Sequence, residues 1–190
     1  GLSMVGKSSI TYCLLNSKVP TEHDPTATDK FTTILEIDNQ SVIIDILDTA
    51  GQEDYQGLFD SWIEFAEGFI LAFSINDRDS FNELDGKRMK LERTNKAKCP
   101  LVVIGNKLDK ENERQVSKEE VLKKVKSWGA EYIETSAVNN INVQEAFIAC
   151  AKKILAKKKV KPPALNNTKK RTDTVNTAVK KQEKGCCSIF

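Results

Sequence analysis

The sequence predicts a three-layer α/β domain with a mostly parallel sheet, and three observations support this. Short apolar runs at 42–47, 69–75 and 101–105 are rich in Val, Ile and Phe, which is typical of strands buried on both faces. Helical patterns lie between these runs. A hairpin in the first quarter of the chain adds one antiparallel edge strand. This order of elements predicts helices on both faces of a single sheet.

The elements follow one another along the chain. A helix is expected from about Lys7, directly after a glycine-rich loop. Asp38-Asn39, between the runs 31–37 and 41–47, is typical of a hairpin turn. Ser117 followed by Glu120 forms a capping box, which predicts the start of another helix. In the last helix, apolar residues between 143 and 155 recur at three- and four-residue spacing and predict one buried face.

The net charge of +2 hides a division of the chain into two parts. The segment 152–190 carries twelve of the 29 basic residues and two of the 27 acidic ones, a net charge of +10, so 1–151 has a net charge of −8. We predict a domain over 1–158 and a basic, disordered tail over 159–190, which contains Pro162-Pro163. No aromatic residue lies between the lysines of this tail to stack on bases, so nucleic acid is not an expected partner.

Two further features of composition limit the class of protein. No run approaches about 18 consecutive apolar residues, so no transmembrane helix is expected. The five cysteines are an odd number without metal-like spacing, which favours a reducing compartment over a disulfide framework.

A glycine-rich loop opens the chain. Residues 1–8, Gly-Leu-Ser-Met-Val-Gly-Lys-Ser, fit G-x-x-x-x-G-K-[ST], in which successive backbone N–H groups point at phosphate oxygens. The helix that follows adds the positive end of its dipole. We expect Lys7 to meet the β- and γ-phosphates and the Ser8 hydroxyl to bind Mg²⁺. Because such a loop normally follows a strand, we expect the chain to be an N-terminally incomplete fragment.

A second motif, Asp48-Thr-Ala-Gly51-Gln52-Glu, follows the apolar run that ends at Leu47. A carboxylate at the carboxyl end of a buried strand lies where open α/β sheets bind ligands. Asp48 is expected to hold Mg²⁺, directly or through water, and Gly51 allows its N–H to approach the γ-phosphate. Gln52 can accept from a water and donate to a phosphoryl oxygen, so it suits the orientation of an attacking water.

Two further segments indicate recognition of guanine. Asn106-Lys107-Leu108-Asp109 follows the run 101–105, and the Asp109 carboxylate offers two acceptors to the N1–H and N2–H₂ donors of guanine. A buried acceptor left unpaired by the wrong base can give about 10⁴-fold discrimination. Glu134-Thr-Ser136-Ala137 would supply a backbone N–H to guanine O6. Taken singly, each segment could instead be a cap or a turn.

Together these four motifs resemble the Ras superfamily of small GTPases over residues 1 to about 158. The sequence of residues 44–53, around Asp48, is similar to that of the Ras/Rap/Ral branch. The resemblance implies a P-loop NTPase fold with a six-stranded sheet, whose first strand this chain would lack. It also implies a monomer that hydrolyses GTP to GDP with Mg²⁺. Exchange factors (GEFs), GTPase-activating proteins (GAPs) and effectors would bind it through two switch segments, 21–26 and 48–55.

The resemblance also assigns roles to residues. Catalytic roles fall to Gln52, Lys7 and Thr26, and the metal ligands are Ser8, Thr26 and Asp48. The nucleotide site comprises Gly1, Ser3, Met4, Val5, Gly6, Lys7, Ser8, Ser9, Val19, Thr26, Gly51, Asn106, Lys107, Asp109, Ser136 and Ala137. No arginine in the switch segments is placed to act as an arginine finger within the same chain. Hydrolysis of GTP is therefore expected to be slow without a GAP.

Three residues depart from the family pattern. Ser3 stands where Ras has a glycine that admits the arginine finger of a GAP, so stimulation by Ras-type GAPs is not implied. Val19 stands where Ras has a phenylalanine that packs on the guanine, and His23 replaces a tyrosine of the first switch segment.

The last four residues, Cys187-Ser-Ile-Phe, fit the C-a-a-X prenylation motif, and Phe at the last position favours geranylgeranylation. Cys186 is a candidate for palmitoylation. One lipid with a basic cluster is expected to anchor the protein to an anionic membrane, most simply the cytoplasmic face of the plasma membrane. Two other classes stay open: a nucleotide-dependent binding module with little or no hydrolysis, and a P-loop ATPase or kinase.

Overall fold

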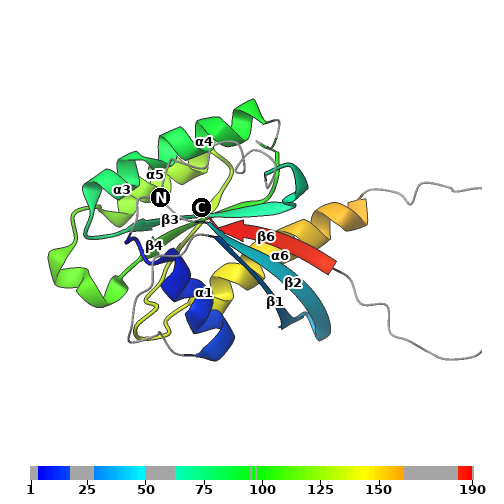
Figure 1. The fold of residues 1–190 in the computed structure, drawn as a ribbon. Coiled ribbons are helices and arrows are strands. Elements are labelled where there is room, and N and C mark those ends of the chain that lie inside the picture. The colour runs from blue at the N-terminus through cyan, green and yellow to red at the C-terminus, as the bar shows by residue number, and fades with distance from the viewer. Residues whose placement is uncertain are drawn as a thin grey trace, which may run out of the picture.

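The computed structural model describes residues 4–17, 28–49, 63–94, 96, 98–160 and 184–189. Figure 1 shows the elements that these residues form. In chain order they are α1 (Lys7–Asn16), β1 (Thr28–Ile37), β2 (Gln40–Thr49), β3 (Gly68–Ser74), α3 (Arg78–Asn82), α4 (Leu84–Arg93), β4 (Leu101–Asn106), the 3₁₀-helix η2 (Leu108–Glu113), α5 (Lys118–Ser127), β5 (Glu131–Glu134), α6 (Val143–Val160) and β6 (Lys184–Ile189).

The strands form one sheet in the order β1-β2-β6-β3-β4-β5. β1 is antiparallel to β2, and every other pair is parallel, which confirms the prediction of a mostly parallel sheet with an antiparallel edge strand. The hairpin turn lies at the predicted Asp38-Asn39, where Ile37 pairs with Gln40. Both turn residues have positive φ, 50° and 62°, as the type I′ turn favoured in two-residue hairpins requires.

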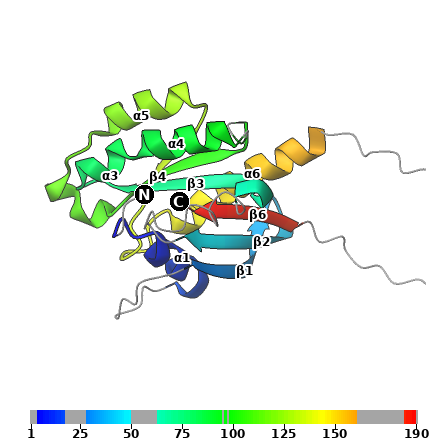
Figure 2. The ribbon, with the colours of Figure 1, turned by 45° about the horizontal axis from the view of Figure 1, so that its top comes forward.

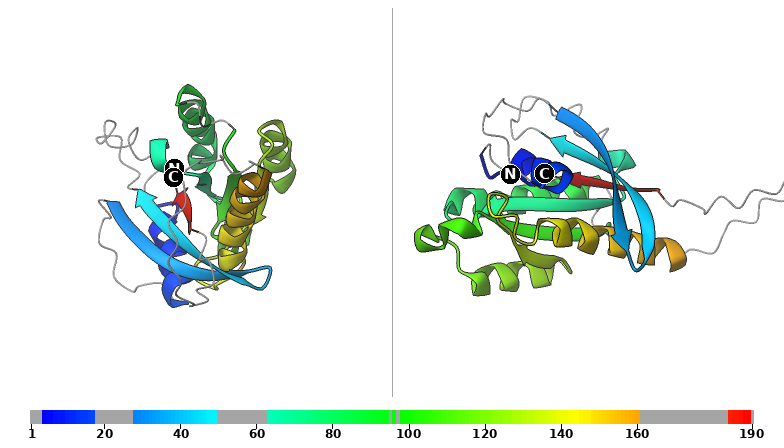
Figure 3. Two further views of the ribbon diagram at one scale, coloured as in Figure 1. Left: turned by 90° about the vertical axis from the view of Figure 1, so that its right-hand side faces the viewer. Right: turned by 90° about the horizontal axis from the view of Figure 1, so that it is seen from below.

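Helices cover both faces of the sheet, so the domain has three layers. α1 and α6 pack on one face and α3, α4 and α5 on the other, and the views in Figures 2 and 3 agree. Successive residues of β3 point into different cores: Ile70 faces the core under α1 and α6, whereas Phe69 and Leu71 face the other. All seven residues of β3 are buried, because a central strand has no polar face.

The predicted helix signals are present. The Ser117 side chain accepts a hydrogen bond from the Glu120 N–H (3.3 Å) and caps α5. α6 buries Val143, Phe147, Cys150 and Ile154 on one side, as their spacing predicts. Among the helices that the structure describes, none combines the length and the apolar character that a membrane span needs.

The structure differs from the prediction for the tail. α6 continues to Val160, and Lys184–Ile189 forms a strand in the middle of the sheet, not a disordered end. In this strand Cys187 is paired with Ile46 of β2 and with Gly68 of β3. β2 and β3 do not pair with each other, so without β6 their facing backbone groups would lack partners inside the sheet. β6 therefore fills a gap that is one strand wide.

Candidate nucleotide-binding site

The glycine-rich loop ends in a turn that only glycine tolerates. Gly6 has a φ of +92°, and a Cβ there would lie 2.4 Å from Asn106 Nδ2. α1 begins at Lys7 without a side-chain cap and without an acidic residue in its first turn. The N–H groups at a helix start lack intrahelical acceptors and favour anions. This turn and helix start therefore form a suitable cradle for phosphate.

Lys7 and Asp48 place two opposite charges beside this cradle. The Lys7 side chain is buried at 6% exposure, and Asp48, near the end of β2, is 1% exposed. Burial lowers the pKa of Lys7, and attraction to Asp48 partly opposes this effect. A bound phosphate would add negative charge beside the ammonium and favour its protonated form. Lys7 is thus suited to an anionic ligand, whereas the Asp48 carboxylate is suited to a cation.

The donor set at this end of the sheet fits Mg²⁺. Ser8 is half-buried in the first turn of α1, and Asp48 supplies a buried carboxylate at the carboxyl end of β2. Mg²⁺ prefers oxygen ligands and is commonly held by one or two carboxylates together with substrate phosphates. Asp48 and Ser8 are therefore the described residues that would hold the metal.

Asn106, the last residue of β4, connects the phosphate cradle to the base-binding loops. Its side chain is 2% exposed. Nδ2 donates to the Val5 carbonyl (2.9 Å), and Oδ1 accepts from Thr135 Oγ1 (3.1 Å) and from the Ala137 N–H (3.3 Å). One side chain thereby fixes three loops relative to one another.

The two loops predicted to bind guanine are also bonded directly. Ser136 Oγ donates to Asp109 Oδ1 (2.5 Å), and the Leu108 N–H donates to the Thr135 carbonyl (3.0 Å). Lys107 has a φ of +67°, so the chain turns sharply between β4 and η2. Burial, followed by repulsion from Lys110, lowers the pKa of Lys107.

The predicted role of Ala137 meets one constraint. Its N–H donates to Asn106 Oδ1 over 3.3 Å, which is long for a hydrogen bond of this kind. To bind guanine O6, this N–H would have to share or give up that bond.

The structure brings most of the described predicted residues to the carboxyl edge of the sheet. These are Met4, Val5, Gly6, Lys7, Ser8, Ser9, Asp48, Asn106, Lys107, Asp109, Ser136 and Ala137. The predicted Gly1, Ser3, Val19, Thr26, Gly51 and Gln52 lie outside the described residues, as do the side chains of Cys186 and Cys187. Nothing in the sequence pointed to the roles of Thr135 and Arg114 in holding the loops, because Arg114 meets Glu134 across 20 residues and Thr135 meets Asn106 across 29.

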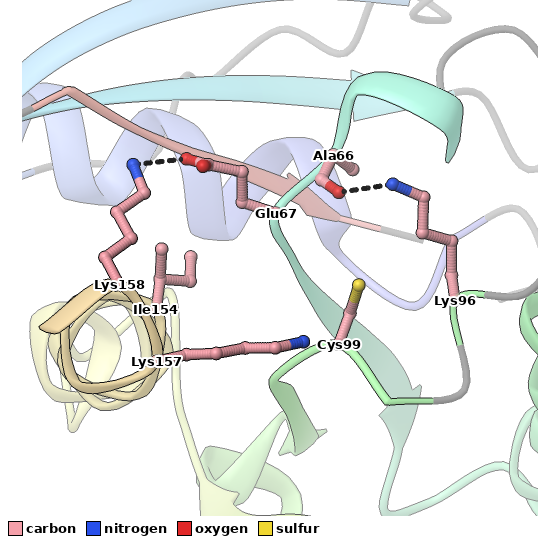
Figure 4. Close-up of a pocket in the computed structure, with 7 residues that line it drawn as sticks. All are labelled: Ala66, Glu67, Lys96, Cys99, Ile154, Lys157 and Lys158. Atoms are coloured by element: carbon pink, nitrogen blue, oxygen red, sulfur yellow. Dashed lines mark hydrogen bonds and ion pairs between the residues drawn. The ribbon is translucent and has the colours of Figure 1, made fainter. Parts of the chain in front are cut away.

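A separate hollow lies at the other edge of the sheet (Figure 4). It is lined by residues before β3 and β4 and by the last turns of α6. Lys158 forms an ion pair with Glu67 (2.9 Å), and Lys96 Nζ donates to the Ala66 carbonyl (3.2 Å). Parallel α/β sheets bind ligands at the carboxyl ends of their strands, and this hollow contains none of the predicted site residues.

The fold and the site define a P-loop nucleotide-binding protein whose base loops suit guanine. Comparison with known proteins narrows this class. Residues 1–156 match the model of the Ras family. Ras-like protein 1 of Saccharomyces cerevisiae is 44% identical over 144 residues, which are 75% of this chain and 47% of the yeast protein.

Two further relatives are similar over a longer stretch. Ras-related protein Ral-B of Rattus norvegicus is 40% identical over 160 residues, and Ras-related protein O-RAL of Diplobatis ommata is 39% identical over 160 residues. In both cases the match covers 83% of this chain and 78% of the relative, whereas the chain spans about half the length of the yeast protein. The chain belongs to the Ras family of small GTPases, which confirms the predicted resemblance.

Proposed function

We propose that this protein is a membrane-anchored molecular switch that binds GTP with Mg²⁺, hydrolyses it to GDP and signals through the difference between the two states. The hydrogen bonds of Asn106 carry this proposal, because they join the phosphate cradle to both base loops. A site built in this way recognises phosphate and base together. Family members interact with regulators and effectors, and for this chain we assign those contacts to the segments 21–26 and 48–55.

The chemistry requires little from the protein beyond position and charge. Lys7 and the positive end of the α1 dipole stabilise negative charge on the phosphates. Asp48, with the hydroxyls of Ser8 and Thr26, would hold Mg²⁺, which neutralises phosphate charge when it is bound. Gln52 orients the attacking water.

Single-turnover hydrolysis of GTP tests this proposal. The wild-type protein is expected to convert bound GTP to GDP slowly, and unlabelled GTP, unlike ATP, is expected to displace a labelled guanine nucleotide. Gln52→Leu should slow hydrolysis without weakening GTP binding. Gln144→Leu, on the exposed side of α6, is the matched control and should leave the rate unchanged.

Each outcome separates this function from its alternatives. Binding of GTP without hydrolysis by the wild type would favour a binding module. Effective competition by ATP would favour an ATPase or kinase. Equal single-turnover rates for wild type and Gln52→Leu would remove Gln52 from the mechanism.

The membrane anchor is supported by the sequence of the tail. Residues 187–190, Cys-Ser-Ile-Phe, fit C-a-a-X, and the segment 152–190 has a net charge of +10. A prenyl chain alone gives modest, reversible binding, and a basic cluster supplies the second attraction to an anionic membrane. We propose the cytoplasmic face of the plasma membrane as the location, with the protein monomeric.

A further inference from the structure

Arg114 lies directly after η2 and joins the two loops of the base site from outside. Its Nε and Nη2 donate to the two carboxylate oxygens of Glu111 (2.8 and 2.6 Å). Its Nη1 donates to Glu134 Oε1 (3.0 Å) and to the Val116 carbonyl (3.2 Å). Glu111 belongs to η2, which also carries Asp109, and Glu134 ends β5, directly before the loop that carries Ser136. One guanidinium thus links both base-binding segments.

The link is partly buried and well anchored. The side chains of Arg114 and Glu134 are 18% and 13% exposed, so water screens the pair less than it screens an ion pair on the open surface. Glu134 Oε1 also accepts from the Tyr132 hydroxyl (3.0 Å). A Cβ at Gly105 would lie 2.4 Å from that hydroxyl, so Tyr132 packs closely on the end of β4, next to Asn106.

We propose that Arg114 is a positioning residue for guanine recognition. Through Glu111 and Glu134 it fixes the separation between Asp109 and the loop that carries Ser136. It thereby holds the base pocket in its closed geometry and limits the release of GDP. The inference rests on the proposed binding of guanine nucleotide, and it adds a residue that does not itself touch the base.

The geometry gives a specific expectation for base selectivity. The Asp109 carboxylate is predicted to accept from N1–H and from the exocyclic amine of guanine, which hypoxanthine lacks. If the position of Asp109 depends on Arg114, loss of the link should weaken GDP binding more than IDP binding. A residue that only stabilises the fold would affect both nucleotides equally.

The test compares Arg114→Gln with Arg78→Gln. Arg78 is a matched control, because it also contacts both carboxylate oxygens of a glutamate, Glu120 (2.7 Å each), and donates to a backbone carbonyl, but it links α3 to α5. Release of a fluorescent GDP analogue in excess Mg²⁺, affinities for GDP and IDP, and the thermal midpoint are measured for each variant. We expect Arg114→Gln to speed release about tenfold or more and to reduce the preference for GDP over IDP several-fold.

The control should change the thermal midpoint but neither release nor preference. Glu134→Gln, which keeps the shape of the side chain and an acceptor oxygen, should give a smaller change in the same direction, and it serves as the test if Arg114→Gln does not fold. Release and preference that match those of Arg78→Gln would overturn the role of Arg114. Failure of the wild type to bind GDP would instead overturn the proposed function.

Discussion

Replacing Asn106 by alanine should remove the three side-chain hydrogen bonds that join the phosphate cradle to the base loops. The substitution removes one donor and one acceptor from a side chain that is 2% exposed. The Val5 carbonyl loses its bond of 2.9 Å, and the Thr135 hydroxyl and the Ala137 N–H lose their common acceptor. The cradle and the base loops are then no longer held by a shared side chain.

The size of the effect follows from the number of bonds. Three hydrogen bonds at about 1 kcal/mol each amount to about 3 kcal/mol, which corresponds to roughly 150-fold in an equilibrium constant. Part of this loss falls on the nucleotide-free protein and lowers its stability without changing affinity. We therefore expect GDP affinity to fall by between about 10-fold and 150-fold, with a lower thermal midpoint.

Ser74→Ala is the matched control for this measurement. Ser74 is fully buried and lies opposite Asn106 in the β3–β4 register, but its hydroxyl donates to Asn76 (2.6 Å) and not to the nucleotide loops. Titration with a fluorescent GDP analogue and thermal unfolding are compared for both variants. Equal affinities for the two variants at similar loss of stability would refute the idea that Asn106 couples the three loops.

Four further predictions concern other parts of the molecule. Ser8→Asn should weaken GTP more than GDP, because it misplaces a metal ligand; equal losses on titration would contradict this. Val19→Phe should slow GDP release several-fold, because the aromatic ring would cover the base. An unchanged release rate would show that residue 19 does not control nucleotide exchange. Gly105→Ala should lower the free energy of unfolding in urea by about 1–3 kcal/mol, since the new Cβ would lie 2.4 Å from Tyr132 Oη; an unchanged midpoint would contradict it. Cys187→Ser should move the protein out of the membrane fraction at high salt, and retention would point to another anchor.

Sequence reasoning was most successful where structure is determined locally. The turn at Asp38-Asn39 needs two residues that tolerate positive φ, and the cap at Ser117 depends on a residue three positions away. The buried strands could be predicted because β3 and β4 are apolar on both faces. Each of these signals is contained within a few residues.

The features that were missed depend on contacts between distant residues. Arg114 meets Glu134 across 20 residues, and Thr135 meets Asn106 across 29. A charged or hydroxyl side chain in a loop gives no sign in the sequence of which partner it will find. β6 was missed for a related reason. Its position is determined by the gap between β2 and β3, and the composition of the tail does not indicate that the tail would fill this gap.

The position of β6 in the sheet would compete with the lipid attachment proposed for Cys187. Backbone pairing joins Lys184–Ile189 to β2 on one side and, over its last three residues, to β3 on the other. If Cys187 is lipidated as proposed, the modifying enzyme would need this end of the chain outside the sheet, and the pairing of β6 with β2 and β3 would withhold it. Any segment that displaced β6 from the gap would release this end. Competition for one hydrogen-bonding position in the sheet would then decide which molecules acquire a membrane anchor.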